Sequence, residues 1–245
     1  MNRRFLPLII GSLLLPLGWG CNDDPTGPTD PFCSSLPASA IVTFEDALLE
    51  AAIRGALGIG TGEDLTCHLI SGLTVLNAHN IGIERLVGIQ NLTNLTLLNL
   101  RLNNITDISV LSGLTNLDFL DLQHNLITDI SALSELTNLR SLGLGSNPIT
   151  DLSALSGLTN LRELRLHSSF DPNPYPITDI SPLSGLTSLT ILDLSNNTGL
   201  SNIQPLLDNT GLGAGDTVRL TNTNVSCTDV AALEAKGVAA ESDCP

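Results

Sequence analysis

The stretch that decides the fold is Leu92–Gly113, LTNLTLLNLRLNNITDISVLSG, because the chain repeats it twice more without a gap. Residues 114–135 read LTNLDFLDLQHNLITDISALSE, and residues 136–157 read LTNLRSLGLGSNPITDLSALSG. Each copy has 22 residues. An internal period of this length indicates a solenoid, in which each repeat forms one coil that packs on its neighbours.

The apolar positions of one copy describe the shape of the coil. They are the first, fourth, seventh, ninth, fourteenth, seventeenth and twentieth, a spacing that belongs neither to a helix nor to a strand alone. It fits a short strand around Leu97–Arg101, a bend, and a tight helical or extended return. The twelfth position is polar, and we expect its amides to bond backbone groups left open where the strand turns. This predicted Asn ladder consists of Asn103, Asn125, Asn147 and Asn197.

The overall composition limits the classes of partner. The chain has 245 residues, a formal net charge of -15, and only 3% aromatic residues, which suits a core column of Leu and Ile. Loss of the first twenty residues would remove Arg3 and Arg4 and leave 8 basic against 25 acidic residues. Such a chain repels a phosphate backbone, so nucleic acid is a poor candidate partner. We interpret the acidity itself as a source of solubility.

Residues 1–20 predict a secretory signal peptide. Two arginines precede the apolar run Phe5–Leu17, which is too short for a comfortable transmembrane helix. Cys21 follows directly, and the segment resembles a bacterial lipoprotein signal, which implies that Cys21 is acylated and anchors the chain. Gly18 and Trp19 depart from the usual motif, so plain cleavage and an uncleaved anchor stay open. Residues 21–37, rich in Pro, Gly, Asp and Thr, predict a disordered tether.

Both ends of the repeat array need a cap, because a bare end would expose the apolar core. Phe44–Leu57 has apolar residues at helical spacing and predicts a helix in an N-terminal cap at residues 38–69. Residues 70–226 predict about seven coils, and residues 227–245 a C-terminal cap with a short helix at Asp229–Lys236. The coil that begins at Leu158 has six extra residues around Phe170–Tyr175. The role of this insertion stays open.

The cysteines match the two predicted caps. The chain has five, and four remain if Cys21 is acylated, which allows three pairings. Cys33 and Cys67 flank the N-terminal cap, whereas Cys227 and Cys244 flank the C-terminal one. The two ends of a rigid rod lie too far apart for a bond between them. We therefore expect two local disulfides, which indicate an oxidising compartment.

The motif LTNLxxLxLxxNxITDIxxL, at Leu92–Leu111, Leu114–Leu133 and Leu136–Leu155, resembles the bacterial internalin-like class of 22-residue leucine-rich repeats. The resemblance extends from Phe44 to the end of the chain. It implies a curved α/β solenoid with a parallel sheet on the concave face and short 3-10 or irregular turns on the convex face. It also implies that the concave face binds protein, without saying which protein.

Side chains alternate along a strand, so positions six, eight and ten of each coil form columns on the concave face. Three basic residues and three acids fall in these columns, which are thus near neutral in an acidic chain. Large apolar and Arg side chains are the usual anchors of an interface. The predicted binding residues are Val75, His79, Leu97, Arg101, Phe119, Asp121, Gln123, Arg165, His167 and Asp193. Gly143 and Gly145 predict a dent in the middle of the face.

Other polar residues carry little functional weight. Asp107, Asp129, Asp151 and Asp179 each begin the sequence Asp-Ile/Leu-Ser, and we interpret them as caps of the return turn in preference to calcium ligands. His68 and His124 fall near turns and are interpreted as solvated or cap-bound. The sequence has no nucleophile and base set, no metal-spaced Cys/His set and no phosphate-cradling Gly loop, which predicts a non-enzyme without metal or cofactor.

The sequence as a whole predicts a monomeric, exported lipoprotein that faces the periplasm or the cell surface and binds a protein or peptide. The alternatives are an envelope-associated module that binds glycan, and a spacer without a specific ligand. Glycan sites usually need exposed aromatic platforms, and only Phe119, Phe170 and Tyr175 offer them, so the glycan alternative ranks second.

Overall fold

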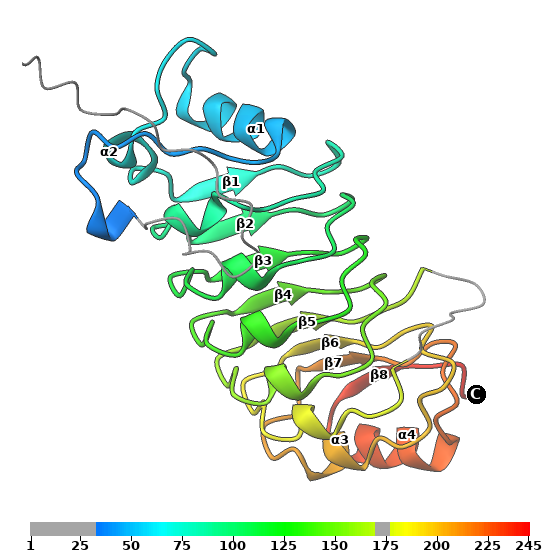
Figure 1. The fold of residues 1–245 in the computed structure, drawn as a ribbon. Coiled ribbons are helices and arrows are strands. Elements are labelled where there is room, and N and C mark those ends of the chain that lie inside the picture. Colours follow the sequence, from blue (N-terminus) through cyan, green and yellow to red (C-terminus); the bar gives the residue numbers. More distant parts are fainter. Residues whose placement is uncertain (1–32, 170–176) are drawn as a thin grey trace, which may run out of the picture. The chain divides into compact units, whose positions relative to one another are not determined.

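One parallel sheet runs through the whole stack of coils in the computed structural model, which describes residues 33–169 and 177–245 (Figure 1). The predicted signal peptide, Cys21 and the insertion Phe170–Tyr175 lie outside the described residues. The sheet has eight strands in chain order. They are β1 (Val75–Asn77), β2 (Leu97–Asn99), β3 (Phe119–Asp121), β4 (Ser141–Gly143), β5 (Glu163–Arg165), β6 (Ile191–Asp193), β7 (Thr217–Arg219) and β8 (Ala239–Glu241).

The strands pair in register, so each repeat position stacks on the same position of the next coil. Val75, Leu97 and Phe119 are successive partners across β1, β2 and β3. The same register continues through β7, and in the middle of each strand a buried Leu or Val points into the core. The predicted parallel sheet is therefore confirmed, although β2 ends at Asn99, two residues before the predicted Arg101.

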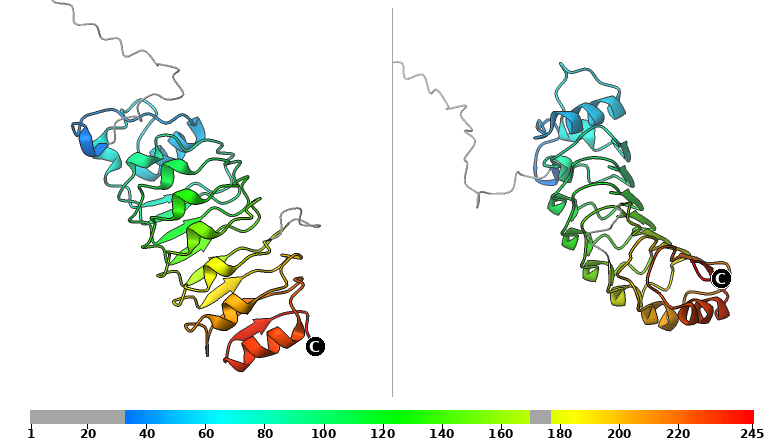
Figure 2. Two further views of the ribbon diagram at one scale, coloured as in Figure 1. Left: turned by 60° about the horizontal axis from the view of Figure 1, so that its bottom comes forward. Right: turned by 90° about the vertical axis from the view of Figure 1, so that its right-hand side faces the viewer.

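Short 3-10 helices form the opposite side of the coils. Figure 2 shows these helices on the outer side of the curved stack of coils, and the sheet on its inner side. This arrangement confirms the predicted concave sheet and 3-10 turns. The helices are η2 (Ile89–Asn91), η3 (Ser109–Leu111), η4 (Ser131–Leu133), η5 (Ser153–Leu155) and η6 (Ser181–Leu183).

The apolar frame of the repeat forms one continuous core. In the coil that begins at Leu92, Leu98, Leu100 and Ile105 are all 0% exposed. Leu and Ile from both sides of each coil contribute to the same cluster, which extends from Val42 to Val238. Removal of this apolar surface from water is the main force that holds the coils together.

The ladder asparagines each connect two coils. Asn125 is 3% exposed, its Oδ1 accepts from Ile105 N at 3.0 Å, and its Nδ2 donates to the carbonyls of Leu100 and Leu122 at 3.0 and 2.9 Å. Asn103, Asn147 and Asn197 repeat this arrangement. Each amide thus satisfies buried backbone groups of its own coil and of the preceding one.

The N-terminal cap centres on α1 (Ala47–Leu57). The helix begins three residues later than the predicted Phe44 because Asp46 is its N-cap: Oδ1 accepts from Leu48 N and Leu49 N at 2.8 and 3.2 Å. Oδ2 accepts from Glu84 N and Arg85 N of the first coil. Burial raises the pKa of Asp46, but these four donors outweigh it, and the pKa of the carboxyl lies below its usual value.

Both predicted disulfides are present. Cys33 in η1 (Cys33–Ser35) bonds to Cys67 in α2 (Cys67–Ile70), and Cys33 N also donates to Asn91 Oδ1 at 2.9 Å. Residues 33–37, within the range predicted as tether, therefore contact the first coil. At the other end Cys227 bonds to Cys244.

The C-terminal end of the stack contains one helix and one strand in addition to the predicted closing helix. The closing helix α4 (Cys227–Ala235) begins two residues earlier than predicted, after the N-cap Ser226. Two elements were not predicted, α3 (Gln204–Asp208) and the edge strand β8. Lys236, the only lysine of the chain, joins the end of α4 to α3, because its Nζ donates to the carbonyls of Leu206 and Leu207 in α3 and of Asn209 just after it.

Candidate interaction surface

Side chains at positions six, eight and ten form one continuous surface, which we call the sheet face. Its most exposed apolar residue is Val75, 50% exposed. Leu97 and Phe119 are half-buried and lie beside it in register. These three residues form the apolar strip on the first three coils. The strip therefore differs from the rest of the sheet face, where most side chains are polar.

A second group of exposed apolar residues lies at the corner where the strands end. Position eleven takes a left-handed conformation in six coils, at Asn80, Leu102, His124, Ser146, Asn196 and Asn222. Leu102 there is 42% exposed, and Ile81 and Leu126, on the neighbouring coils, are 40% and 52% exposed. We call these three residues the apolar corner. Sequence analysis missed it because its members fall at positions eleven, twelve and thirteen and share no single column.

The predicted dent at Gly143 and Gly145 does not exist as an open hollow. A Cβ on Gly143 would lie 2.7 Å from Gln123 Nε2, and one on Gly145 would lie 2.6 Å from the carbonyl oxygen of His167. Asp121 and Gln123 are consequently buried, at 7% and 2% exposure, although they point to the sheet face. The glycines leave room, but neighbouring polar side chains of the same face occupy it. The prediction of a dent was wrong.

Charges on the later coils of the sheet face lie close to opposite charges. The guanidinium of Arg165 contacts the carboxylate of Glu163 in the same strand. His167 Nδ1 lies 3.6 Å from Asp193 Oδ2, too long for a hydrogen bond but close enough for attraction if the ring is protonated. Arg219 Nε donates to Glu241 Oε2 at 2.9 Å. Arg165 is therefore paired within its own strand, and Asp193 Oδ1 accepts from Ser195 N at 3.0 Å. Among the described residues, His167 Nδ1 is buried and has no hydrogen-bond partner.

Arg101 differs from these residues. Within residues 33–169 and 177–245, its guanidinium has no carboxylate partner and no hydrogen bond. Asp121 on the next coil is engaged elsewhere, because its Oδ1 accepts from both Gln123 N and Gln123 Nε2 at 3.0 Å. On the other side, His79 is exposed and its Nδ1 lies 3.0 Å from Asn77 Oδ1. The first three coils thus combine the apolar strip with an unneutralised cation.

His124, interpreted as solvated or cap-bound, is half-buried and thus only partly solvated. The left-handed backbone at φ 56° turns its ring toward the sheet face, where it meets the ring of His167 edge to face at 6.4 Å. Burial lowers the pKa of His124, and the positive Arg101 and the neighbouring His167 lower it further, against a smaller opposite effect of Asp121. His124 is therefore neutral at neutral pH.

Acidification is expected to destabilise the fold through His124. The unfolded chain takes up this proton near the ordinary pKa of histidine, about 6.5, whereas the folded chain takes it up at lower pH. Stability should therefore fall as the pH drops through about 6.5 and level off below the folded pKa. The lowered carboxyl pKa values of Asp46, Asp129 and Asp179 act only at more acidic pH. Urea midpoints between neutral and mildly acidic pH measure the effect.

The matched variant for this measurement is His124→Asn, because Asn tolerates the left-handed conformation and does not titrate. Its urea midpoint should change less over the same pH range than that of the parent. The difference should be under about 1 kcal/mol, because the ring remains partly solvated. An equally steep decline in the variant would show that another group causes it.

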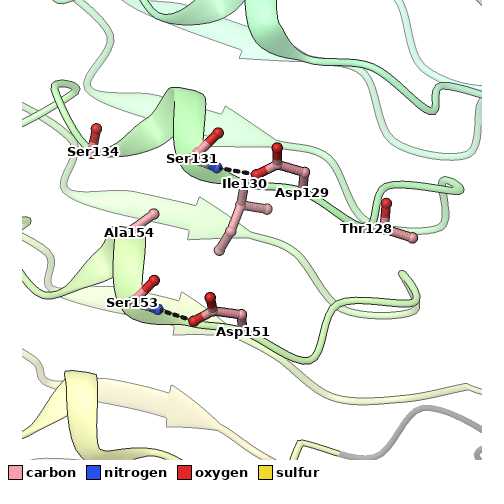
Figure 3. Close-up of a pocket in the computed structure, with 8 residues that line it drawn as sticks. All are labelled: Thr128, Asp129, Ile130, Ser131, Ser134, Asp151, Ser153 and Ala154. Carbon is pink, nitrogen blue, oxygen red and sulfur yellow. Dashed lines mark hydrogen bonds between the residues drawn. The ribbon is translucent and has the colours of Figure 1, made fainter.

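The row of aspartates lies at the turns and not on the sheet face. Oδ1 of Asp107, Asp129, Asp151 and Asp179 accepts from the backbone N of the Ser two residues later, each at 2.8 Å. In Figure 3, Asp129 and Asp151 line a shallow hollow of about 250 Å³ between two coils, with Ser131 and Ser153 at the starts of η4 and η5. These bonds hold the pKa of Asp129 and Asp179 below the usual value. The geometry supports the interpretation as caps.

Comparison with known proteins agrees with this architecture. The family model described as leucine rich repeats, in two copies, matches residues 93–135 and 137–175. No curated protein matches the chain.

Several solved structures are similar. An internalin (inlF) from Listeria monocytogenes aligns with a TM-score of 0.72 and 34% identity over 81% of this chain, which spans 56% of that protein's chain. Internalin C2 from the same species aligns with a TM-score of 0.62 and 29% identity over 84% of this chain and 100% of its own. A leucine-rich repeat protein from Leptospira interrogans aligns with a TM-score of 0.56 and 25% identity over 66% and 41%.

Proposed function

Because the described part of this chain is an internalin-like leucine-rich repeat solenoid, we propose that it binds a protein or peptide partner through its sheet face. The observation that carries the proposal is the apolar strip, in which Val75 is exposed and Leu97 and Phe119 are half-buried, on the same face as Arg101. Exposed contiguous apolar surface with a polar border is typical of protein interfaces. Large side chains and Arg are the groups that contribute most when such an interface forms.

Within the predicted surface, the first three coils are more suitable for binding than the later coils. Each coil holds its strand rigidly between two neighbours, so the strip is presented in one geometry and loses little entropy on binding. On the later coils, Arg165 lies beside the opposite charge of Glu163, and breaking this contact would offset part of any gain. We therefore place the centre of binding at Leu97, Arg101 and Phe119, with Val75 and His79 at its edge.

We further propose that the chain is a non-catalytic, monomeric protein that acts outside the cytoplasm and is anchored through acylated Cys21. The two disulfides support an oxidising compartment. No helix within residues 33–169 and 177–245 is long and apolar enough to cross a membrane. Lipid attachment is tested by mass spectrometry of the N-terminal peptide from the exported chain, with Cys21→Ala as control.

Capture of partners tests the binding proposal. Envelope and secreted proteins of the source organism are passed over the immobilised chain and over the double variant Leu97→Ser/Phe119→Ser. Coupling through amines is avoided, because the only side-chain amine belongs to Lys236, which holds the C-terminal cap. We expect specific proteins on the parent chain and their loss on the double variant.

The control is Ile41→Ser, which also removes an exposed apolar side chain, 58% exposed, but in the N-terminal cap and not on the sheet face. This variant should capture the same proteins as the parent. Equal capture by all three chains would place binding elsewhere. No capture by any would shift weight to a glycan ligand or a spacer role.

A further inference from the structure

Resting on this proposed function, we infer that the partner presents a carboxylate, from Asp, Glu or a chain terminus, with large apolar side chains beside it. The arrangement that carries the inference is Arg101 at position ten of its coil, on the same sheet face as Leu97 and Phe119 at position six and followed in the chain by the exposed Leu102. We call these four residues the Arg101 patch.

The backbone that carries Arg101 is held on both sides. Arg101 N donates to Asn99 Oδ1 at 3.1 Å, and Arg101 O accepts from Asn80 N of the preceding coil at 2.9 Å. The next residue, Leu102, donates from its N to Gln123 O of the following coil at 2.9 Å. The half-buried guanidinium therefore projects from a fixed base, and an incoming anion need not order the backbone beneath it.

The chain leaves Arg101 without a counter-charge although acids are abundant. Of its eight basic residues after Cys21, five form ion pairs with carboxylates of the described part, and the exposed Arg162, outside the sheet face, forms none. Lys236 bonds to three carbonyls instead. On the sheet face of the first three coils the only acid is Asp121, and its Oδ1 already accepts two bonds from Gln123. The guanidinium thus keeps its donors available for a carboxylate.

The apolar neighbours define what accompanies the carboxylate. Leu97 lies four residues before Arg101 on the same coil, and Phe119 is the register partner of Leu97 on the next coil. Leu102 lies on the corner side and is 42% exposed. Apolar side chains of the partner on both sides of the ion pair would exclude water from it and strengthen it.

The chemistry favours a single carboxylate over a polyanion. A phosphate-rich or strongly acidic ligand would be repelled by a chain with net charge -15. A peptide with one carboxylate brings a single negative charge to the Arg101 guanidinium, and its neutral apolar residues add no further charge. We therefore commit to a peptide segment with one acid among large apolar residues.

Selection from a random linear peptide library displayed on phage tests the inference. The library is panned in parallel on the full chain and on Arg101→Gln. On the parent chain we expect enrichment of Asp or Glu next to Leu, Phe or Trp. On Arg101→Gln the apolar enrichment should persist, and the acidic enrichment should disappear.

The affinities of one selected peptide and of its acid-to-amide analogue then measure how much the pair between Arg101 and the peptide carboxylate contributes to binding. On the parent chain the analogue should bind about tenfold more weakly, as expected for loss of one charge-assisted pair. On Arg101→Gln the two peptides should bind equally, and Arg101→Lys should restore part of the difference. The matched control is Arg162→Gln, which removes an exposed arginine outside the positions that form the sheet face and should keep the tenfold preference. Unchanged melting temperatures show that each variant is folded.

The possible outcomes separate the two proposals. Peptides that lose binding to Leu97→Ser/Phe119→Ser but show no preference for the acid on the parent chain would overturn the carboxylate inference alone. An acid preference that survives in Arg101→Gln would also overturn it. Peptides that bind this double variant as well as the parent chain would contradict binding at the apolar strip, and with it both proposals. A library that yields no peptide specific for the parent would also count against both.

Discussion

Replacement of Asn125 by Ala should lower the free energy of unfolding by about 2–3 kcal/mol, because the buried Ile105 N loses its only hydrogen-bond partner. Leu100 O and Leu122 O each lose one of two donors and keep the amides of Asn103 and Asn147. These groups lie between coils, where the smaller side chain leaves little room for waters to replace the amide. The melting temperature, followed by circular dichroism, should fall by roughly 7 °C.

Asn138→Ala is the matched control for this experiment. Its side chain is exposed and donates one hydrogen bond, from Nδ2 to Thr115 O at 2.8 Å, so water can replace it. The expected loss is below about 1 kcal/mol. If Asn125→Ala were no more destabilising than Asn138→Ala, the ladder would not be a source of stability.

Replacement of Gly88 by Ala should be comparably severe, at about 3 kcal/mol or more, because it combines backbone strain with overpacking. Gly88 has a φ of 106°, which an L residue rarely adopts, and a Cβ there would lie 2.5 Å from both Phe44 Cδ1 and Thr43 O. The residue lies where the N-terminal cap meets the first coil. The variant should therefore loosen this junction, visible as faster hydrogen exchange in α1 and β1 before global unfolding.

Gly113→Ala is the control, because a Cβ at Gly113 meets nothing within 4 Å and its φ is not left-handed. We expect a change within about 0.5 kcal/mol, or a slight gain from reduced freedom of the unfolded chain. A Gly88→Ala variant as stable as Gly113→Ala would mean that the cap does not pack on the first coil as described.

Much of the fold follows from the sequence alone because the repeat is local. Each coil uses the same spacing, so Leu98, Ile105 and Asn103 have roles that their equivalents share, and stacking places like positions side by side. The register of the strands, the 3-10 turns and the buried ladder could be expected for this reason. The two disulfides could be predicted as well, because a stiff array keeps the caps apart.

Elements that break the repeat could not be read in this way. The strand β8 has the sequence Ala239-Ala240-Glu241, which carries no strand preference of its own, and it forms because β7 offers an unpaired edge. Asp46 joins the cap helix to the first coil through Glu84 N and Arg85 N, more than thirty residues away. Such pairings depend on which open groups meet in space.

Which positions face the inner side of the coils follows from the local chain, because side chains alternate along a strand. What these side chains do there depends on the packing of the coils on one another. Gln123 leans over Gly143 and engages Asp121, Glu163 lies against Arg165, and Arg101 keeps its charge unneutralised. These outcomes depend on distances between neighbouring coils and on competition among several polar groups. The identities of the residues at the facing positions give neither.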